Sequence, residues 1–266
     1  MRKNKVGAFL MKYSVLLIGL GTAHQAMAQD VATPYPAMAP IDQYLMADRE
    51  AEIALARSAA PESISRDATV LVLGRKGYET AVEGRNGFVC VVVRAWTAAF
   101  DWPEFWNPKV RAADCMNPQS ARSILPIIYL RTKMVMAGQS KAEVLSALKT
   151  AYADKRLPEL ENGAMDYMMS KSAYLTDANG HNLPHLMWYT ALADGKDWGA
   201  YEAGSPVMAS PYWFFSSNEP SQMKGLPQIL VFLVGAGGWS DGTAASEHGQ
   251  NDPQSKAAAR PEENAR

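Results

Sequence analysis

Three β-rich runs separated by two short glycine-bounded turns lie between residues 68 and 96, and they constrain the fold more than any other feature. ATVLVL (68–73) precedes Gly-Arg-Lys-Gly, YETAVE (78–83) precedes Gly-Arg-Asn-Gly, and FVCVVVRAW continues to Trp96. Short glycine turns between β-formers are typical of hairpins. The pattern predicts a three-stranded antiparallel meander, with the last run central because it is apolar on both faces.

Helix signals flank these runs. We expect a helix over residues 42–58, with Asp42 capping its first turn. Asn117 followed by proline suits a second helix start, which Pro126 must kink or restart. Ser140 and Glu143 form a capping box for a third helix.

The remaining β-rich runs are MDYMMS (165–170), HLMWYTA (185–191) and QILVFLVG (228–235). The order is then one helix, three strands, further helices and further strands. This order predicts an α+β fold, with an antiparallel sheet of about five to six strands and helices packed on one side.

The N-terminus is typical of a secretory signal. Basic residues precede a short apolar run, and Ala26-Met27-Ala28 has the small-x-small form of a signal peptidase site. We therefore expect a signal peptide over 1–28, a linker over 29–40, one domain over 41–240 and a disordered polar tail over 241–266. A retained membrane anchor is the alternative, although the apolar run is short for a span. Both interpretations place the chain outside the cytoplasm, in the periplasm or secreted.

Signal removal changes the charge balance. The full chain has 26 Lys+Arg and 27 Asp+Glu, and residues 1–28 hold four basic and no acidic residues. The mature chain therefore carries 22 basic against 27 acidic residues, a net charge of −5. This balance argues against a nucleic-acid partner, which would require a basic surface.

Cys90 and Cys115 are the only cysteines. An even, small count in an exported chain predicts a disulfide, and closing a loop of this length contributes roughly 3.5 kcal/mol in the chain-entropy treatment. A free, buried Cys90 among its valine neighbours is the alternative.

Two histidines, His181 and His185, stand four residues apart in TDANGHNLPHLMW. That spacing chelates zinc when it lies on a helix, but Gly180 and Pro184 oppose a helix and the preceding Asp-Ala-Asn-Gly is turn chemistry. We expect a hairpin loop that ends with His185 at the start of a strand. Catalytic roles for His185 or His181 with Asp177 stay open, as does a structural or surface role. We expect no metal, because no second cluster completes the ligand set.

An aromatic stretch, residues 96–108, contains Trp96, Trp102 and Trp106. Aromatic platforms beside carboxylates suit sugars or aromatic ligands, and we count Trp188 as a fourth candidate for ligand binding. A glycosidase pair of Asp101 and Glu104 is a further reading. The stretch can also be a long loop anchored under its own aromatic rings.

Several common site motifs are missing. The chain has no Gly-Lys phosphate loop, no H-E-x-x-H and no C-x-x-C. Its one G-x-S-x-G string, Gly238 to Gly242, precedes a polar tail and not a helix, so it does not form a nucleophile elbow. We therefore expect no cofactor, and the sequence does not decide whether the protein is an enzyme.

The segments DATVLVLGRKGYETAVEGRNGFVCVV, FWNPKVRAADCMNP, YMMSKSAYLTDANGHNLPHLMW and WSDGT together resemble a group of uncharacterised exported bacterial proteins over about residues 45–243. The resemblance implies export and a single domain, and it carries no assigned activity. At the level of fold alone, the element order is also similar to extracytoplasmic sensors of the PAS or Cache kind. The function expected is a module that binds a small ligand or a protein partner. The alternative is a secreted hydrolase that uses His185 or His181 with a carboxylate, with or without a metal.

Overall fold

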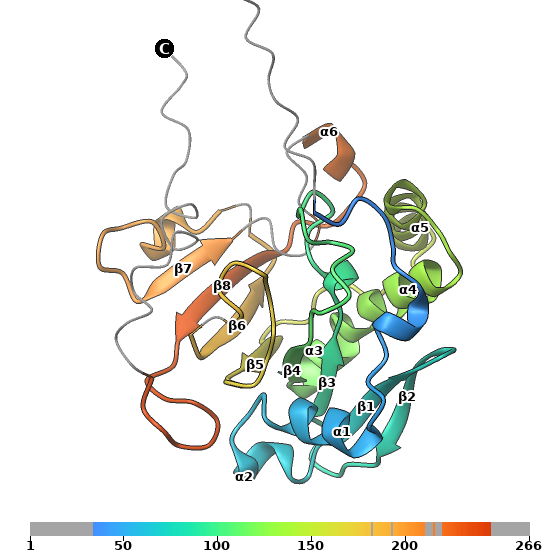
Figure 1. Ribbon diagram of the computed structural model, residues 1–266. Coiled ribbons are helices and arrows are strands. Elements are labelled where there is room, and N and C mark those ends of the chain that lie inside the picture. Colours follow the sequence, from blue (N-terminus) through green and yellow to red (C-terminus); the bar gives the residue numbers. More distant parts are fainter. Residues whose placement is uncertain (1–33, 182, 193, 211–214, 216–219, 246–266) are drawn as a thin grey trace, which may run out of the picture. The chain divides into compact units, whose positions relative to one another are not determined.

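The computed structural model describes residues 34–181, 183–192, 194–210, 215 and 220–245 (Figure 1). Its core is one mixed sheet of eight strands in the order β2-β1-β3-β4-β5-β6-β8-β7. All neighbouring strands are antiparallel except β1 and β3, which are parallel. The predicted α+β class is confirmed, but the sheet is larger than the five to six strands expected and is not purely antiparallel.

The strands are β1 (Thr69–Gly74), β2 (Gly77–Val82), β3 (Val89–Val93), β4 (Ala112–Met116), β5 (Met165–Met168), β6 (His185–Thr190), β7 (Val207–Ser210) and β8 (Leu230–Gly235). The α-helices are α1 (Arg49–Arg57), α2 (Glu62–Ser65), α3 (Pro118–Ser123), α4 (Leu125–Met136), α5 (Lys141–Ala153) and α6 (Pro220–Met223). Three 3₁₀ helices complete the elements, namely η1 (Ile41–Gln43), η2 (Ala95–Thr97) and η3 (Lys196–Trp198).

The predicted meander is wrong in its last pairing. β2 forms the expected hairpin with β1, but β3 lies on the other side of β1, with Val89 opposite Thr69. The β2–β3 connection passes so close beneath β1 that a Cβ on Gly84 would lie 2.1 Å from the Thr69 amide nitrogen. β1 is buried on both faces, so a central position between two strands is favourable for it. β2 exposes Glu79 and Thr80, which is compatible with its position at the edge of the sheet.

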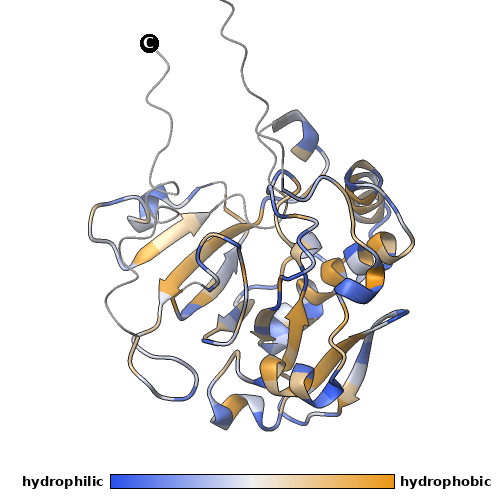
Figure 2. Cartoon of the chain, in the orientation of Figure 1, coloured by the Kyte–Doolittle hydropathy of each residue, from blue (hydrophilic) through white to orange (hydrophobic). Residues whose placement is uncertain are grey.

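Helices cover both faces of the sheet, not one. On one face, Ile53 and Ala56 of α1 pack with Val70, Val72 and Val92. On the other, residues of α4 and α5 pack against the alternate residues of the same strands, among them Leu71 and Val91. β1 and β3 are apolar at successive positions, so each needs cover on both sides, and Figure 2 shows these central strands as largely hydrophobic.

The local helix signals are mostly confirmed. Asn117 caps α3 by accepting from the Ser120 amide, Pro126 lies in the first turn of the separate helix α4, and Ser140 with Glu143 forms the capping box of α5. The first helix begins later than expected. Asp48, not Asp42, accepts from the first amides of α1, and Asp42 lies in η1.

The proposed signal peptide and residues 246–266 of the polar tail lie outside the described residues. Next to them, Tyr35 of the linker donates to Asp177, and Asp241 of the tail pairs with Lys171 at 2.5 Å. Within the described part of the chain, no helix is long and apolar enough to cross a membrane.

Candidate functional site

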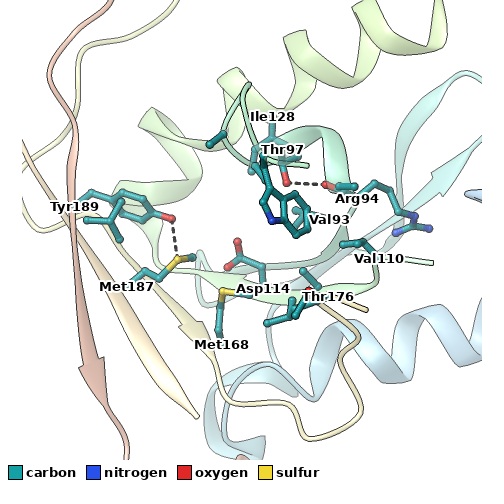
Figure 3. A pocket seen from close by; sticks show the side chains of 17 residues that line it. Val93, Arg94, Thr97, Val110, Asp114, Ile128, Met168, Thr176, Met187 and Tyr189 are labelled. Carbon is teal, nitrogen blue, oxygen red and sulfur yellow. Dashed lines mark hydrogen bonds between the residues drawn. The ribbon is translucent and has the colours of Figure 1, made fainter. Parts of the chain in front are cut away.

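A cavity of about 310 Å³ lies over the α4 face of the sheet, beneath the segment that follows β3 (Figure 3). Its lining comes from the five consecutive sheet strands β3, β4, β5, β6 and β8, from α4 and η2, and from the β3–β4 and β5–β6 loops. The lining residues are Val93, Arg94, Ala95, Thr97, Ala98, Ala99, Trp102, Val110, Ala112, Asp114, Ile128, Met168, Leu175, Thr176, Met187, Tyr189 and Val231. Most of these side chains are aliphatic, aromatic or thioether groups, so the cavity is an apolar chamber with few polar groups.

Asp114 stands in the middle of β4, which is buried along its whole length. Strand alternation places Asp114 on the cavity face, while its neighbour Cys115 faces α1. The side chain is 3 % exposed, and its Oδ1 atom has no hydrogen-bond partner among the described residues. Figure 3 shows its carboxylate directed toward the centre of the lining residues. A buried, unpartnered carboxylate costs folding free energy, so its presence here needs a functional explanation.

A second aspartate lies behind the first. Asp166 of β5 is fully buried, and the register that sets it opposite Met116 places it on the same face as Asp114. Its Oδ2 accepts from the Tyr189 hydroxyl at 2.6 Å, while its Oδ1 has no hydrogen-bond partner in the part of the chain that the structure describes. Three neighbouring strands thus bring two carboxyl groups and one phenol together.

Burial disfavours ionisation of both aspartates. It raises the pKa of Asp166 to about 7, even though the hydroxyls of Ser120 and Tyr189 act to lower it. Burial also raises the pKa of Asp114 well above its usual range, and the negative charge of Asp166 adds to the effect. The pair therefore holds protons at a pH where ordinary aspartates are ionised, and it can bind a cation or exchange a proton with a bound molecule.

Arg94 lines the cavity without offering it a charge. Its guanidinium donates to the Tyr44 carbonyl oxygen at 2.7 Å, to Glu52 at 2.8 Å and to the Val92 carbonyl oxygen. Figure 3 shows this guanidinium directed away from Asp114. The buried Arg94–Glu52 pair is therefore self-contained.

The hairpin prediction for the histidine segment is confirmed. Thr176 and Gly180 form an isolated bridge, Gly180 has a φ of +72°, and His185 is the first residue of β6. A positive φ is readily adopted by glycine, so this residue allows the chain to reverse. The two histidines do not share a helix.

Asp177, the carboxylate suggested as their partner, already has four donors. Its oxygens accept from Tyr35 at 2.5 Å, from Lys109 at 3.1 Å, from Asn107 at 3.3 Å and from Tyr174. The hydroxyls of Tyr174 and Tyr35 are the largest causes that hold the pKa of Asp177 well below its usual range. Asp177 therefore anchors a loop and is a poor proton acceptor.

The two histidines lie in different surroundings. His185 is 7 % exposed, its Nδ1 lies 2.7 Å from the Leu183 carbonyl oxygen, and burial lowers its pKa. Its Nε2 has no hydrogen-bond partner among the residues that the structure describes. His181 is exposed, and its ring lies perpendicular to that of Trp239, with the ring centroids 5.1 Å apart. Within the described ranges, no group of three or more His, Cys, Asp or Glu side chains is arranged to hold a metal.

The four candidate tryptophans do not form one platform. Trp96 is fully buried and donates to Thr132 at 3.0 Å, and Trp106 is buried against Phe105. Trp188 is 51 % exposed and follows Met187 on the opposite face of β6. Of the four, only Trp102 lines the cavity.

Glu104, one of the suggested glycosidase carboxylates, is also occupied. It accepts from the Thr176 hydroxyl at 2.6 Å and from the Asp177 backbone amide at 3.0 Å. These bonds join the aromatic loop to the β5–β6 hairpin. Glu104 therefore holds the aromatic loop in place, in agreement with the interpretation of this stretch as an anchored loop.

Cys90 and Cys115 form a disulfide between directly opposed positions of β3 and β4. Both are fully buried on the α1 face. The bond joins two adjacent strands of the sheet, because residues 112–116 form β4. Cys115 directly follows Asp114 in β4, so the disulfide fixes the strand that carries Asp114.

The sequence analysis overlooked Asp114, Asp166 and Tyr189. A signal was present, because each aspartate interrupts an otherwise apolar run, AADCM and MDYMM. A charged residue inside a buried strand is rare unless it is paired or functional. Comparison with known proteins adds no assignment, since no family model matches the chain and neither a curated protein nor a solved structure is similar to it.

Proposed function

We propose that the protein is an exported binding module that holds a small, largely apolar ligand in the cavity between the sheet and the aromatic loop. The observation that carries the proposal is the combination of an apolar chamber of about 310 Å³ with the buried, unpartnered carboxylate of Asp114. Ligand sites are typically apolar pockets with a few oriented polar groups, and an apolar cavity of about 150 Å³ already accommodates benzene.

The walls agree with this role. Ile128, Met168 and Met187 supply aliphatic and thioether contact, and Trp102 supplies an aromatic surface. Methionine side chains adapt to the shape of what they contact. Rigid strands carry the polar groups, so the site is preorganised.

Binding of the neutral dye N-phenyl-1-naphthylamine, followed by its fluorescence, tests the proposal. Ala98→Trp places a bulky ring in the cavity and is expected to lower the dye affinity at least about tenfold. Ala142→Trp makes the same change on an exposed position of α5 and should leave the affinity unchanged. Equal affinities for the two variants, or no dye binding by the wild type, would contradict the proposal.

Intrinsic fluorescence provides an independent readout. Trp102→Phe should remove the change in tryptophan emission that accompanies dye binding, because Trp102 lines the cavity. Trp188→Phe should preserve that change, since Trp188 lies on the other face of β6. If Trp188→Phe removed the emission change and Trp102→Phe did not, the dye would bind outside the cavity.

Export is supported by the sequence of residues 1–28 and by the disulfide, which persists in oxidising compartments. N-terminal sequencing of the exported protein should begin at Gln29. Material that begins at Met1 would contradict processing at the proposed site.

A further inference from the structure

The cavity has one charged group with unused capacity. Arg94 and Asp114 are the two charged residues of its lining, and the guanidinium of Arg94 has three acceptors of its own. Within the described ranges, one carboxylate oxygen of Asp114 has no hydrogen-bond partner. Any charge that a ligand brings into this chamber will therefore meet Asp114 first.

The charge of the aspartate pair is also uncompensated. Asp166 lies on the adjacent strand and is fully buried, and the hydroxyl groups beside it, those of Tyr189 and Ser120, are neutral. Neither aspartate takes part in the ion pairs formed among the described residues. Two buried carboxyl groups side by side resist ionisation unless a cation joins them.

We infer that the ligand is an organic cation, a primary or secondary amine whose ammonium group binds the carboxylate of Asp114 and whose hydrocarbon part contacts Ile128, Met168 and Met187. This inference rests on the proposed function of the cavity. An ammonium group supplies both the hydrogen-bond donors and the positive charge that Asp114 lacks, and charge-assisted hydrogen bonds are about twice as strong as neutral ones. An anion would face like charge in a medium of low polarity.

The selectivity can be measured with three compounds of similar size, 2-phenylethylamine, 2-phenylethanol and 3-phenylpropionate, each competing with N-phenyl-1-naphthylamine at pH 7.5. We expect the amine to displace the dye at least about tenfold more strongly than the alcohol, and the carboxylate to be the weakest competitor. Asp114→Asn preserves the shape of the side chain and removes its charge. In this variant the amine should lose about tenfold in affinity, whereas the alcohol and the dye should change by less than about twofold.

Dye binding by Asp114→Asn serves as the control for an intact cavity. Asp154→Asn serves as the matched control at an exposed carboxylate outside the lining, with the amine affinity unchanged. Equal competition by amine and alcohol would overturn the inference while the proposed function stands. So would an amine preference that survives in Asp114→Asn. Tighter binding of the alcohol would instead assign a neutral ligand to Asp114. Absence of dye binding by the wild type would overturn the proposed function itself.

Discussion

The β5–β6 hairpin and the cavity both hold carboxylates, but they use them in opposite ways. In the hairpin, Asp177 is partly exposed and accepts from four side chains, and its pKa is lowered. In the cavity, Asp114 is buried without a partner on Oδ1, and its pKa is raised. The carboxylate with satisfied hydrogen bonds contributes to stability, whereas the unsatisfied one stores free energy that a ligand can release.

The largest expected effect is on the pH dependence of stability. Asp166, with its pKa raised to about 7, and Asp114 bind more protons in the folded protein than in the unfolded chain, where aspartate has a pKa of about 3.9. The free energy of unfolding contributed by these groups is present at low pH and falls by several kcal/mol as the pH rises from about 4 to about 7. Urea denaturation of Asp114→Asn/Asp166→Asn across this range should give a flatter profile than the wild type.

The hairpin carboxylate provides the contrast. The lowered pKa of Asp177 means that its contribution is lost only as the pH falls below the range of an ordinary aspartate. Asp177→Asn should therefore leave the slope between pH 4 and pH 7 unchanged. A cavity variant with the slope of the wild type would show that the two sites do not differ in this way.

A second prediction makes one chemical change at both sites. At pH 8, Asp114→Leu should stabilise the protein by about 1 to 2 kcal/mol, because it removes a buried ionisable group from an apolar chamber. Asp177→Leu should destabilise it by about 1 kcal/mol, because four donors lose their acceptor at a partly exposed site. Chemical denaturation measures both changes, and equal signs would contradict the comparison.

The smallest effects concern the two histidines of the hairpin. His185→Ala should cost about 1 kcal/mol, because the buried ring contacts the Leu183 carbonyl group and fills space beside Met168. His181→Ala should cost less than about 0.5 kcal/mol, because His181 is exposed. Denaturant melts of both variants test this difference. Zinc bound by the wild type and lost in both variants would instead restore the metal-dependent hydrolase.

Local sequence was sufficient where the decisive residues are neighbours. The cap at Asn117, the capping box of Ser140 and the turn at Gly180 each depend on a few consecutive residues, and the structure contains all three. The first helix was placed too early because Asp42 and Asp48 are both acceptable caps. Only packing against the sheet separates such alternatives.

The candidate site was predicted less well, because its chemistry is assembled from separate strands. Asp177 and the histidines attracted attention through their proximity in the sequence. Asp114 and Asp166 belong to strands separated by α3, α4 and α5, and nothing in either strand specifies the other as its neighbour. Each aspartate can be recognised in the sequence because it interrupts an apolar run. The sequence does not show that the two aspartates lie close together.

The sequence by itself determined the α+β class, most helix and strand positions, the hairpin before His185 and the cysteine pair available for a disulfide. These features follow from short-range propensity, turn chemistry and composition. Only the tertiary structure decided that β3 pairs with β1 in parallel, that helices cover both faces, and that Asp114, Asp166 and Tyr189 meet beside a cavity. Strand order and register result from competition among distant surfaces for burial, and that competition is settled by the whole chain at once.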